Sequence, residues 1–187
     1  MGSRTTHWAV VIGHSLTHPG ATNPSSGISE YSFNARLAQR IGEIIADCSA
    51  VDVSLVYRQS YRELPDDINR LQPDCCLSLH CNAFDTTASG TQTLYNHTSP
   101  AGKALAMVLQ RELVDCLGLS DRGVTPVRDN ERGSHMLKHT QAPCVIAEPF
   151  FIDNNSDLHR ALERFDELAR TYARFICGRA SYGCTPE

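Results

Sequence analysis

Short apolar runs alternate along this chain with longer segments in which apolar residues recur every three or four positions. Residues 7–12 (HWAVVI) and 144–147 (CVIA) are apolar almost throughout, as expected of strands that are covered on both faces. The segments between such runs have the periodicity of amphipathic helices, and strands that alternate with helices favour a parallel sheet. We therefore predict an α/β fold with a mostly parallel, twisted central sheet and helices on both of its faces.

The order of elements follows from these runs and from the turn residues that separate them. We predict strands over residues 7–12, 51–57, 75–82, 90–95 and 144–147, and helices over residues 30–48, 61–71, 100–117 and 155–177. Neither an internal repeat nor a linker rich in glycine and serine interrupts the series. We therefore expect a single domain over residues 1–187, with its core between about residues 7 and 178.

The composition excludes several classes of partner. The chain of 187 residues has a net charge of −4 with 20% charged residues, and it has no basic stripe of the kind that binds nucleic acid. No apolar run approaches the roughly 20 residues of a membrane span, and no apolar signal-peptide segment follows the N-terminus. We expect a monomer without nucleic-acid binding or membrane insertion, synthesised in the cytoplasm without a visible signal peptide.

The eight cysteines raise the question of disulfides and zinc knuckles. In a strand over residues 75–82, Cys76 and Cys81 face opposite sides, and Cys75 and Cys81 lie about 20 Å apart, so these residues cannot share a metal ion. We expect most of the cysteines to be small buried hydrophobic residues in a reducing compartment. Cys177 and Cys184 are the pair most easily joined by a disulfide.

Three predicted strands carry a polar, chemically versatile residue at or near their carboxyl ends. His14 follows residues 7–12, His80 lies late in residues 75–82, and Glu148 follows residues 144–147. Ligands of open α/β sheets bind beyond the carboxyl ends of the strands, so these side chains are candidates for one crevice.

A fourth residue, Glu30, opens the helix that follows the first strand and its loop. Two imidazoles and a carboxylate form a catalytic zinc set with one position left for water, and a second carboxylate can act as the base. Taken singly, His14 and His80 are better explained as structural histidines, and Glu30 as a first-turn carboxylate that stabilises a helix N-terminus. Glu148 is harder to explain structurally, because it follows an apolar run and has no charged neighbour in the sequence.

An ordered series of six motifs extends this pattern from about residue 10 to residue 162. The motifs are Gly13-His14 with His18-Pro19-Gly20-Ala21, Glu30 with Asn34, Leu37 and Ala38, residues 78–83 (SLHCNA), Gly90 with Tyr95, Arg122-Gly123-Val124, and Glu148 with Phe150, Ile152 and Asn154. The series resembles the zinc-dependent N-acetylmuramoyl-L-alanine amidases of bacterial cell-wall turnover and phage lysis. The sequence departs from that family's pattern at Ser15, Cys81 and Pro149.

The resemblance implies a zinc ion, Zn²⁺, held by His14, Glu30 and His80, with Glu148 as general base and acid on the attacking water. The implied reaction is cleavage of the amide between N-acetylmuramic acid and the L-alanine of the stem peptide, with peptidoglycan as the substrate. The link between Phe84 and Gly90 is too short for the blocking helix that some members insert there, so we expect an open cleft.

Three further residues are candidates for contacting the substrate. These residues are Asn82, His135 and Lys138; for the last two, and for Arg132, a place in a solvated loop is at least as good an explanation. The enzyme would act on the cell wall or in the periplasm, after release by a phage or after export.

Two alternatives use the same residues. A zinc carboxypeptidase or another small amidohydrolase on a related scaffold would keep the metal ligands and take a different substrate. A non-catalytic cell-wall-binding module would keep the zinc site for structure alone.

Overall fold

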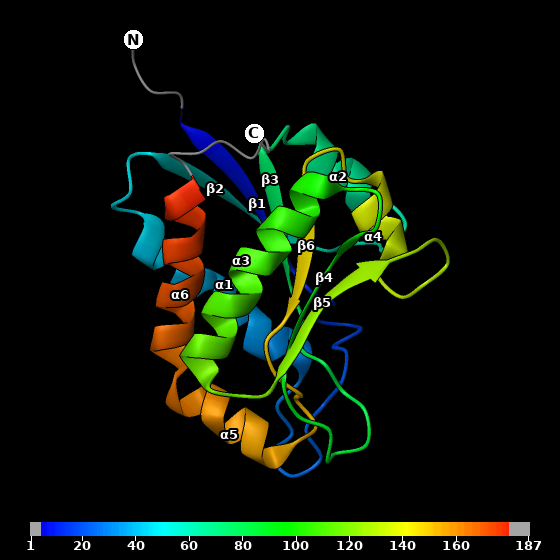
Figure 1. The fold of residues 1–187 in the computed structure, drawn as a ribbon, viewed down its shortest axis with the longest axis vertical. Helices are drawn as coiled ribbons and strands as arrows, with labels where there is room; N and C mark the ends of the chain where they lie inside the picture. The colour runs from blue at the N-terminus through cyan, green and yellow to red at the C-terminus, as the bar shows by residue number, and fades with distance from the viewer. Residues whose placement is uncertain (1–4, 180–187) are drawn as a thin grey trace.

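The computed structural model of the chain describes residues 5–179, which form one six-stranded sheet in the order β2-β1-β3-β6-β4-β5 (Figure 1). Strand β1 pairs in parallel with β2 and β3, β3 pairs in parallel with β6, and β4 runs antiparallel to β6. The mostly parallel sheet is therefore confirmed. The strands are β1 (Thr6–Ile12), β2 (Val51–Tyr57), β3 (Cys75–Leu79), β4 (Thr91–Asn96), β5 (Asp121–Val127) and β6 (Cys144–Glu148).

Helices cover both faces of the sheet, as predicted (Figure 1). Helices α1, α3 and α6 pack on one face, and the short helices α2 and α4 pack on the other. None of the helices within residues 5–179 is long and apolar enough to cross a membrane. The helices are α1 (Glu30–Ile45), α2 (Leu64–Arg70), α3 (Pro100–Leu117), α4 (Ser134–His139), α5 (Asn155–Glu163) and α6 (Phe165–Arg179).

The uninterrupted apolar run of β1 reflects burial on both sides of the sheet. Val10 and Ile12 belong to the larger core beneath α1, α3 and α6. Ala9 and Val11 point the other way, into the smaller core beneath α2 and α4. Side chains alternate between the two faces of a strand, so a strand covered on both faces must be apolar at successive positions.

Four details differ from the predicted elements. Strand β5 and helix α4 were not predicted, because β5 (DRGVTPV) contains glycine and proline and α4 has only six residues with no side-chain cap. The predicted helix over residues 155–177 is two helices that meet at Arg164. Helix α2 begins at Leu64 rather than residue 61, with proline in its first turn. Strand β3 ends at Leu79, so that His80 lies just beyond the strand.

Most of the described cysteines carry free thiols. These are Cys48, Cys76, Cys81, Cys116, Cys144 and Cys177, whereas Cys75 is disulfide-bonded. Cys177, which the sequence offered as the easiest partner for Cys184, is among the free thiols; Cys184 lies outside the described residues.

The chain passes from β1 into the following loop through a close backbone contact at Gly13. The Gly13 N–H donates a hydrogen bond of 2.9 Å to the carbonyl of Leu79. A Cβ atom at Gly13 would lie 2.4 Å from that carbonyl oxygen and 2.7 Å from Cε1 of His80. Only glycine fits this position without a shift of the backbone.

Replacing Gly13 with alanine should destabilise the protein by roughly 1–3 kcal/mol, since the neighbouring backbone must move to admit the methyl group. Gly42→Ala is the matched control, because nothing lies within 4 Å of a Cβ there and the residue is inside α1. That control should be neutral or stabilising by about 0.5–1 kcal/mol. Urea denaturation of both variants measures the difference, and equal stabilities would contradict the proposed close contact.

Candidate metal centre

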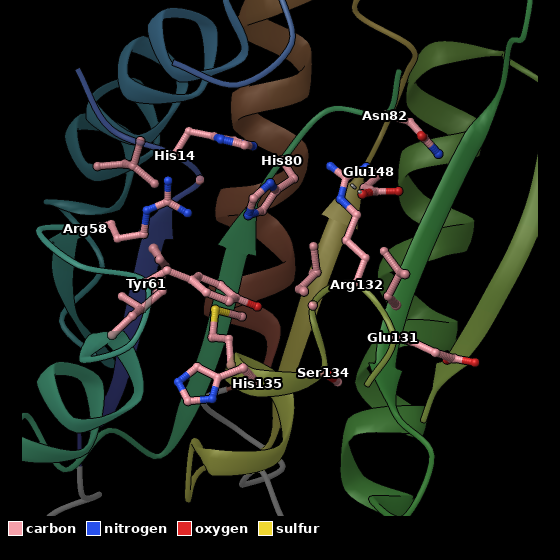
Figure 2. A pocket seen from close by; sticks show the side chains of 18 of the residues that line it. His14, Arg58, Tyr61, His80, Asn82, Glu131, Arg132, Ser134, His135 and Glu148 are labelled. Atoms are coloured by element: carbon pink, nitrogen blue, oxygen red, sulfur yellow. Dashed lines mark ion pairs between the residues drawn. The ribbon is translucent and has the colours of Figure 1, made fainter. Parts of the chain in front are cut away.

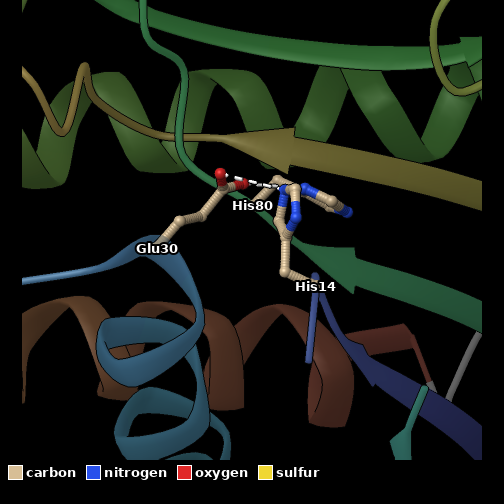
Figure 3. Close-up of side chains that lie close together, drawn as sticks. All are labelled: His14, Glu30 and His80. Atoms are coloured by element: carbon tan, nitrogen blue, oxygen red, sulfur yellow. Dashed lines mark hydrogen bonds and ion pairs between the residues drawn. The ribbon is translucent and has the colours of Figure 1, made fainter. Parts of the chain in front are cut away.

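Two imidazoles and one carboxylate from three separate segments converge at the carboxyl edge of the sheet (Figure 3). Nε2 of His14 lies 3.0 Å from Oε2 of Glu30, and Nδ1 of His80 lies 2.8 Å from Oε1. The potential ligand atoms of the three residues all lie within 4.8 Å of one another. The three residues that the sequence pattern singled out are therefore brought together.

The register of the parallel strands explains why these side chains lie together at the carboxyl edge of the sheet. Ile12 of β1 is level with Tyr57 of β2 and with Leu79 of β3, and Leu79 is level with Ala147 of β6. The next residue of each strand therefore falls in one row across four neighbouring strands, and the row reads Arg58, Gly13, His80 and Glu148.

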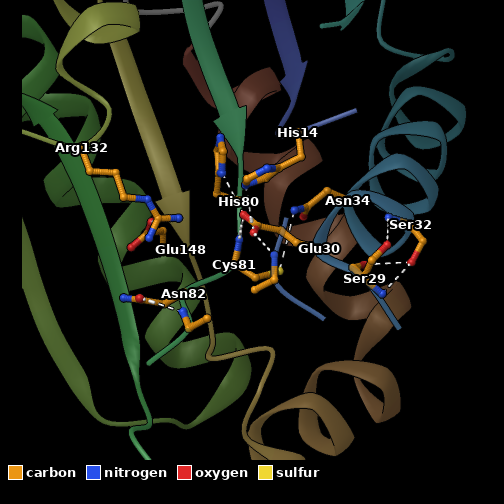
Figure 4. Close-up of polar contacts among 12 residues, drawn as sticks. His14, Ser29, Glu30, Ser32, Asn34, His80, Cys81, Asn82, Arg132 and Glu148 are labelled. Carbon is orange, nitrogen blue, oxygen red and sulfur yellow. Dashed lines mark hydrogen bonds and ion pairs between the residues drawn. The ribbon is translucent and has the colours of Figure 1, made fainter. Parts of the chain in front are cut away.

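Helix α1 places Glu30 through its first turn (Figure 4). Ser29 caps the helix, with reciprocal side-chain to backbone hydrogen bonds between Ser29 and Ser32, which satisfies two N–H groups at the helix start. The Glu30 side chain is 1% exposed. Its Oε1 accepts a hydrogen bond of 3.0 Å from the Cys81 N–H, and its Oε2 accepts one of 3.3 Å from the Ala21 N–H.

The loop between β1 and α1 is shaped around the site. His14 has a φ of 68°, in the left-handed region that residues other than glycine seldom adopt. Gly20 has a φ of 77°, and a Cβ atom there would lie 2.6 Å from Oε2 of Glu30 and 2.7 Å from Cδ2 of His14. The Pro19-Gly20 step thus lets the backbone pass directly against both side chains.

The electrostatic state of Glu30 is set by its two histidine neighbours. Burial by itself raises the pKa of this carboxyl group, but the neighbouring imidazoles of His14 and His80 outweigh that effect, His80 with a hydrogen bond of 2.8 Å. The net pKa lies well below its usual range, so that the group is ionised near neutral pH.

The donor set fits a zinc ion. Nε2 of His14 is buried and has no hydrogen-bond partner among the described residues, although Oε2 of Glu30 is only 3.0 Å away. Nε2 of His14 is therefore close to the Glu30 carboxylate without being aligned for a hydrogen bond to it. This arrangement is expected when both groups are directed at one metal ion. Two imidazoles and a carboxylate are a usual ligand set for catalytic zinc, which leaves a coordination position open.

We expect the purified protein to bind about one zinc ion per chain. Added zinc should raise Tm, because a ligand at 100 times its Kd stabilises the folded state by about 2.7 kcal/mol. His80→Ala should lose most of this shift, whereas His159→Ala should keep it, since His159 is exposed and paired with Glu163 on α5. Thermal melts with and without zinc measure the shift; an unchanged shift in His80→Ala would rule out this residue as a ligand.

Glu148, the last residue of β6, is the second carboxylate of the site. Burial raises its pKa, and this effect is opposed by the positive charge of Arg132 and by His80. The Arg132 side chain is 66% exposed, and its Nη2 lies 3.9 Å from Oε1 of Glu148. The negative charge of Glu148 is thus only weakly stabilised by its surroundings, and such a carboxylate accepts a proton readily.

This raised pKa predicts how Glu148→Gln changes stability with pH in the metal-free protein. Protonation of Glu148 favours the folded state, so its stabilisation is present below pH 4 and is lost as the pH rises through the raised pKa. The advantage of Glu148→Gln over wild type should therefore grow between pH 4 and pH 8, by about 1.4 kcal/mol per unit of pKa shift.

Denaturation at several pH values measures this difference, with Glu163→Gln as the control because Glu163 is exposed on α5. Parallel pH profiles of wild type and Glu148→Gln would show that Glu148 has an ordinary pKa.

A cavity of about 520 Å³ opens above the row of strand ends (Figure 2). His14, His80 and Glu148 line it, and so do Asn82 and His135 from the sequence prediction. No helix lies between β3 and β4, where the sequence left no room for one. Lys138 is not part of the cavity lining, and its Nζ is paired with Asp129 at 2.7 Å.

The cavity wall also contains Arg58 and Tyr61, which were not singled out from the sequence. Arg58 directly follows β2, so the rule that located His14, His80 and Glu148 at strand ends also applies to it. Tyr61 carries no comparable signal in the sequence.

The fold and the site together are those of a hydrolase with an α/β fold, with candidate metal ligands and a second buried carboxylate around one cavity. A model of the N-acetylmuramoyl-L-alanine amidase family matches residues 9–177. The chain belongs to this family.

Known proteins agree with this assignment. The chain is 30% identical over 151 residues to the N-acetylmuramoyl-L-alanine amidase LytC of Bacillus subtilis, an alignment that covers 78% of this chain and 29% of LytC. The chain thus spans less than a third of that relative.

Solved structures share the fold. The N-acetylmuramoyl-L-alanine amidase from Clostridium difficile 630 superposes with a TM-score of 0.86 at 19% identity, covering 95% of this chain and 97% of the other. The catalytic domain of CwlV, from Bacillus (Paenibacillus) polymyxa var. colistinus, superposes with a TM-score of 0.81 at 20% identity, covering 95% and 98%.

Proposed function

We propose that this chain is a zinc-dependent peptidoglycan hydrolase that cleaves the amide between N-acetylmuramic acid and the L-alanine of the stem peptide. The observation that carries the proposal is the convergence of His14, Glu30 and His80 within 4.8 Å, beside a cavity that Glu148 also lines. Membership of the amidase family supports this substrate over that of a carboxypeptidase or another amidohydrolase. The second carboxylate in the cavity supports a catalytic role over a purely wall-binding one.

His14, Glu30 and His80 would hold the zinc ion. When bound, zinc lowers the pKa of a water molecule toward about 7 and polarises the carbonyl that is attacked. The ionised carboxylate of Glu30 contributes the negative charge of the ligand set, because its pKa is low. Its hydrogen bonds from the Cys81 and Ala21 N–H groups hold it in place, as is usual for carboxylates that bind a metal.

Glu148 would act as general base and then as general acid. Its carboxylate would accept a proton from the attacking water and return that proton to the nitrogen of the leaving L-alanine. A buried carboxylate suits both steps, because burial raises its pKa and so makes it a better proton acceptor than an exposed glutamate. Arg132, 3.9 Å from Glu148, would help to keep the carboxylate ionised before the proton transfer.

Substrate contacts would come from the walls of the cavity. The Asn82 side chain donates to Oε1 of Gln92 at 3.3 Å, and Nε2 of His135 lies 3.0 Å from the carbonyl of Arg62. Both residues line the cavity, which supports a role in binding the muropeptide. A contact of Lys138 with the substrate stays a prediction, since its ammonium group is paired with Asp129.

The proposed substrate places the activity at the cell wall. Release by a phage and export by a bacterium are both compatible with this function. In either case peptidoglycan would be the partner, bound through the cavity described above.

Glu148→Gln should lower the rate of stem-peptide release by about 10²–10⁴-fold, the usual contribution of a general base. Zinc content should stay at the wild-type level, because Glu148 is not one of the three proposed ligands. Mass spectrometry of digested muropeptides and metal analysis of the same samples provide the two measurements. Glu163→Gln, at an exposed site on α5, is the matched control and should have normal activity.

Near wild-type release of stem peptide by a fully zinc-loaded Glu148→Gln would exclude the proposed role of Glu148. Products with a shortened stem still attached to the sugar would identify the enzyme as a peptidase instead of an amidase.

A further inference from the structure

Arg58 brings a positive charge into the wall of the cavity, next to the row of proposed metal ligands. It is the first residue after β2 and lies level with Gly13 and His80, beyond the paired residues Tyr57, Ile12 and Leu79. Neighbouring strands are roughly 5 Å apart, so the backbones of Arg58 and His80 lie about 10 Å from each other. A side chain as long as arginine's therefore extends toward the space above the two histidines.

The Arg58 guanidinium has no acceptor in the described part of the chain. Within residues 5–179 its side chain makes neither a hydrogen bond nor an ion pair, although the residue is half-buried. Burial lowers its pKa, and the nearby charge of Glu30 offsets only part of that effect. A partly buried cation without a bound partner is costly for the fold, and such groups in a cavity are commonly ligand sites.

Tyr61 holds Arg58 in position. The guanidinium carbon lies 5.7 Å from the centre of the Tyr61 ring, within the range of a cation–π contact. The Tyr61 ring centre in turn lies 5.5 Å from that of His135 on helix α4. The ring that contacts Arg58 is therefore itself packed against a residue of α4.

The other cationic groups of the cavity already face an acceptor. His14 and His80 face Glu30, and Arg132 lies beside Glu148. Figure 2 shows Arg58 and Tyr61 on one side of His80, with Arg132 and Glu148 on the opposite side. Among these cationic groups, Arg58 is thus the one without a negative neighbour in contact among the described residues, and it is free to bind a negative group of a ligand.

We infer that Arg58, supported by Tyr61, is a carboxylate-binding subsite that receives the free α-carboxylate of the second residue of the stem peptide. The inference rests on the proposed function. Guanidinium groups bind carboxylates with two parallel hydrogen bonds, which gives both strength and orientation. In a stem whose second residue is a γ-linked glutamate, this carboxylate is the first one beyond the scissile amide.

The reach of the substrate agrees with this placement. Two residues of extended chain span at most about 7 Å, so the carboxylate stays within that distance of the scissile nitrogen. Arg58 begins about two strand spacings, or roughly 10 Å, from His80 and extends back toward it. The subsite would therefore favour stems with a free carboxylate at the second residue over stems in which that group is amidated.

The test compares two muropeptides that differ only in this group, one with the α-carboxylate and one with the carboxamide. Wild-type enzyme should prefer the carboxylate, and Arg58→Met should lower kcat/KM for it roughly 10- to 100-fold, as expected for hydrogen bonds to a charged group. The same substitution should change kcat/KM for the carboxamide little. Arg58→Lys keeps the charge without the paired hydrogen bonds and should recover part of the preference.

Arg62→Met is the matched control, since Arg62 is exposed, lies four residues further along the same segment and is not part of the cavity lining. It should leave both rates unchanged. An equal loss toward both substrates in Arg58→Met, or no loss toward either, overturns the subsite and leaves the amidase proposal standing.

A failure of the proposed function is recognised separately. If zinc-loaded wild-type enzyme releases stem peptide from neither substrate, the subsite is judged by calorimetric titration with L-alanyl-D-glutamate and with L-alanyl-D-isoglutamine, in which only the α-carboxylate is amidated. A preference for the carboxylate that Arg58→Met abolishes supports the subsite without the amidase activity. No preference in wild type overturns it.

Discussion

A carboxylate that is almost fully buried needs compensation from the protein around it, and Glu30 receives it from both ends of the site. His14 comes from the end of β1, and His80 and the Cys81 N–H come from the end of β3. These contacts keep the pKa of Glu30 low despite its burial. The same contacts hold the loop between β1 and α1 against the sheet, so the candidate metal centre and the local fold depend on one another.

Parallel strand pairing turns residues that are distant in the sequence into neighbours. Because β2, β1, β3 and β6 are adjacent and in register, the residues that follow or end them lie in one row. That row places Arg58 at one end and Glu148 at the other, with His80 between them. The level ends of these parallel strands thus account for the positions of the proposed substrate anchor Arg58, the proposed metal ligand His80 and the proposed base Glu148. The distances between these residues follow from the spacing of the strands.

Most of the sheet and the candidate metal centre could be predicted from the sequence, because buried parallel strands are apolar at successive positions and end at one edge. Strand β5 could not, since an edge strand containing Gly123 and Pro126 lacks a strand pattern. The break at Arg164 is hidden because the apolar periodicity runs on through it. Arg58 was missed because an arginine after a strand usually faces solvent, and its lack of an acceptor is visible only in three dimensions.

The convergence of His14, Glu30 and His80 on one ion is the central claim, and anomalous diffraction at the zinc edge tests it most directly. Crystals grown with zinc should show one strong peak bonded to both imidazoles and to the Glu30 carboxylate, with zinc–nitrogen distances of about 2.0–2.1 Å. An empty site in zinc-saturated crystals, or a peak bound elsewhere while His14 and His80 still face Glu30, would contradict the account.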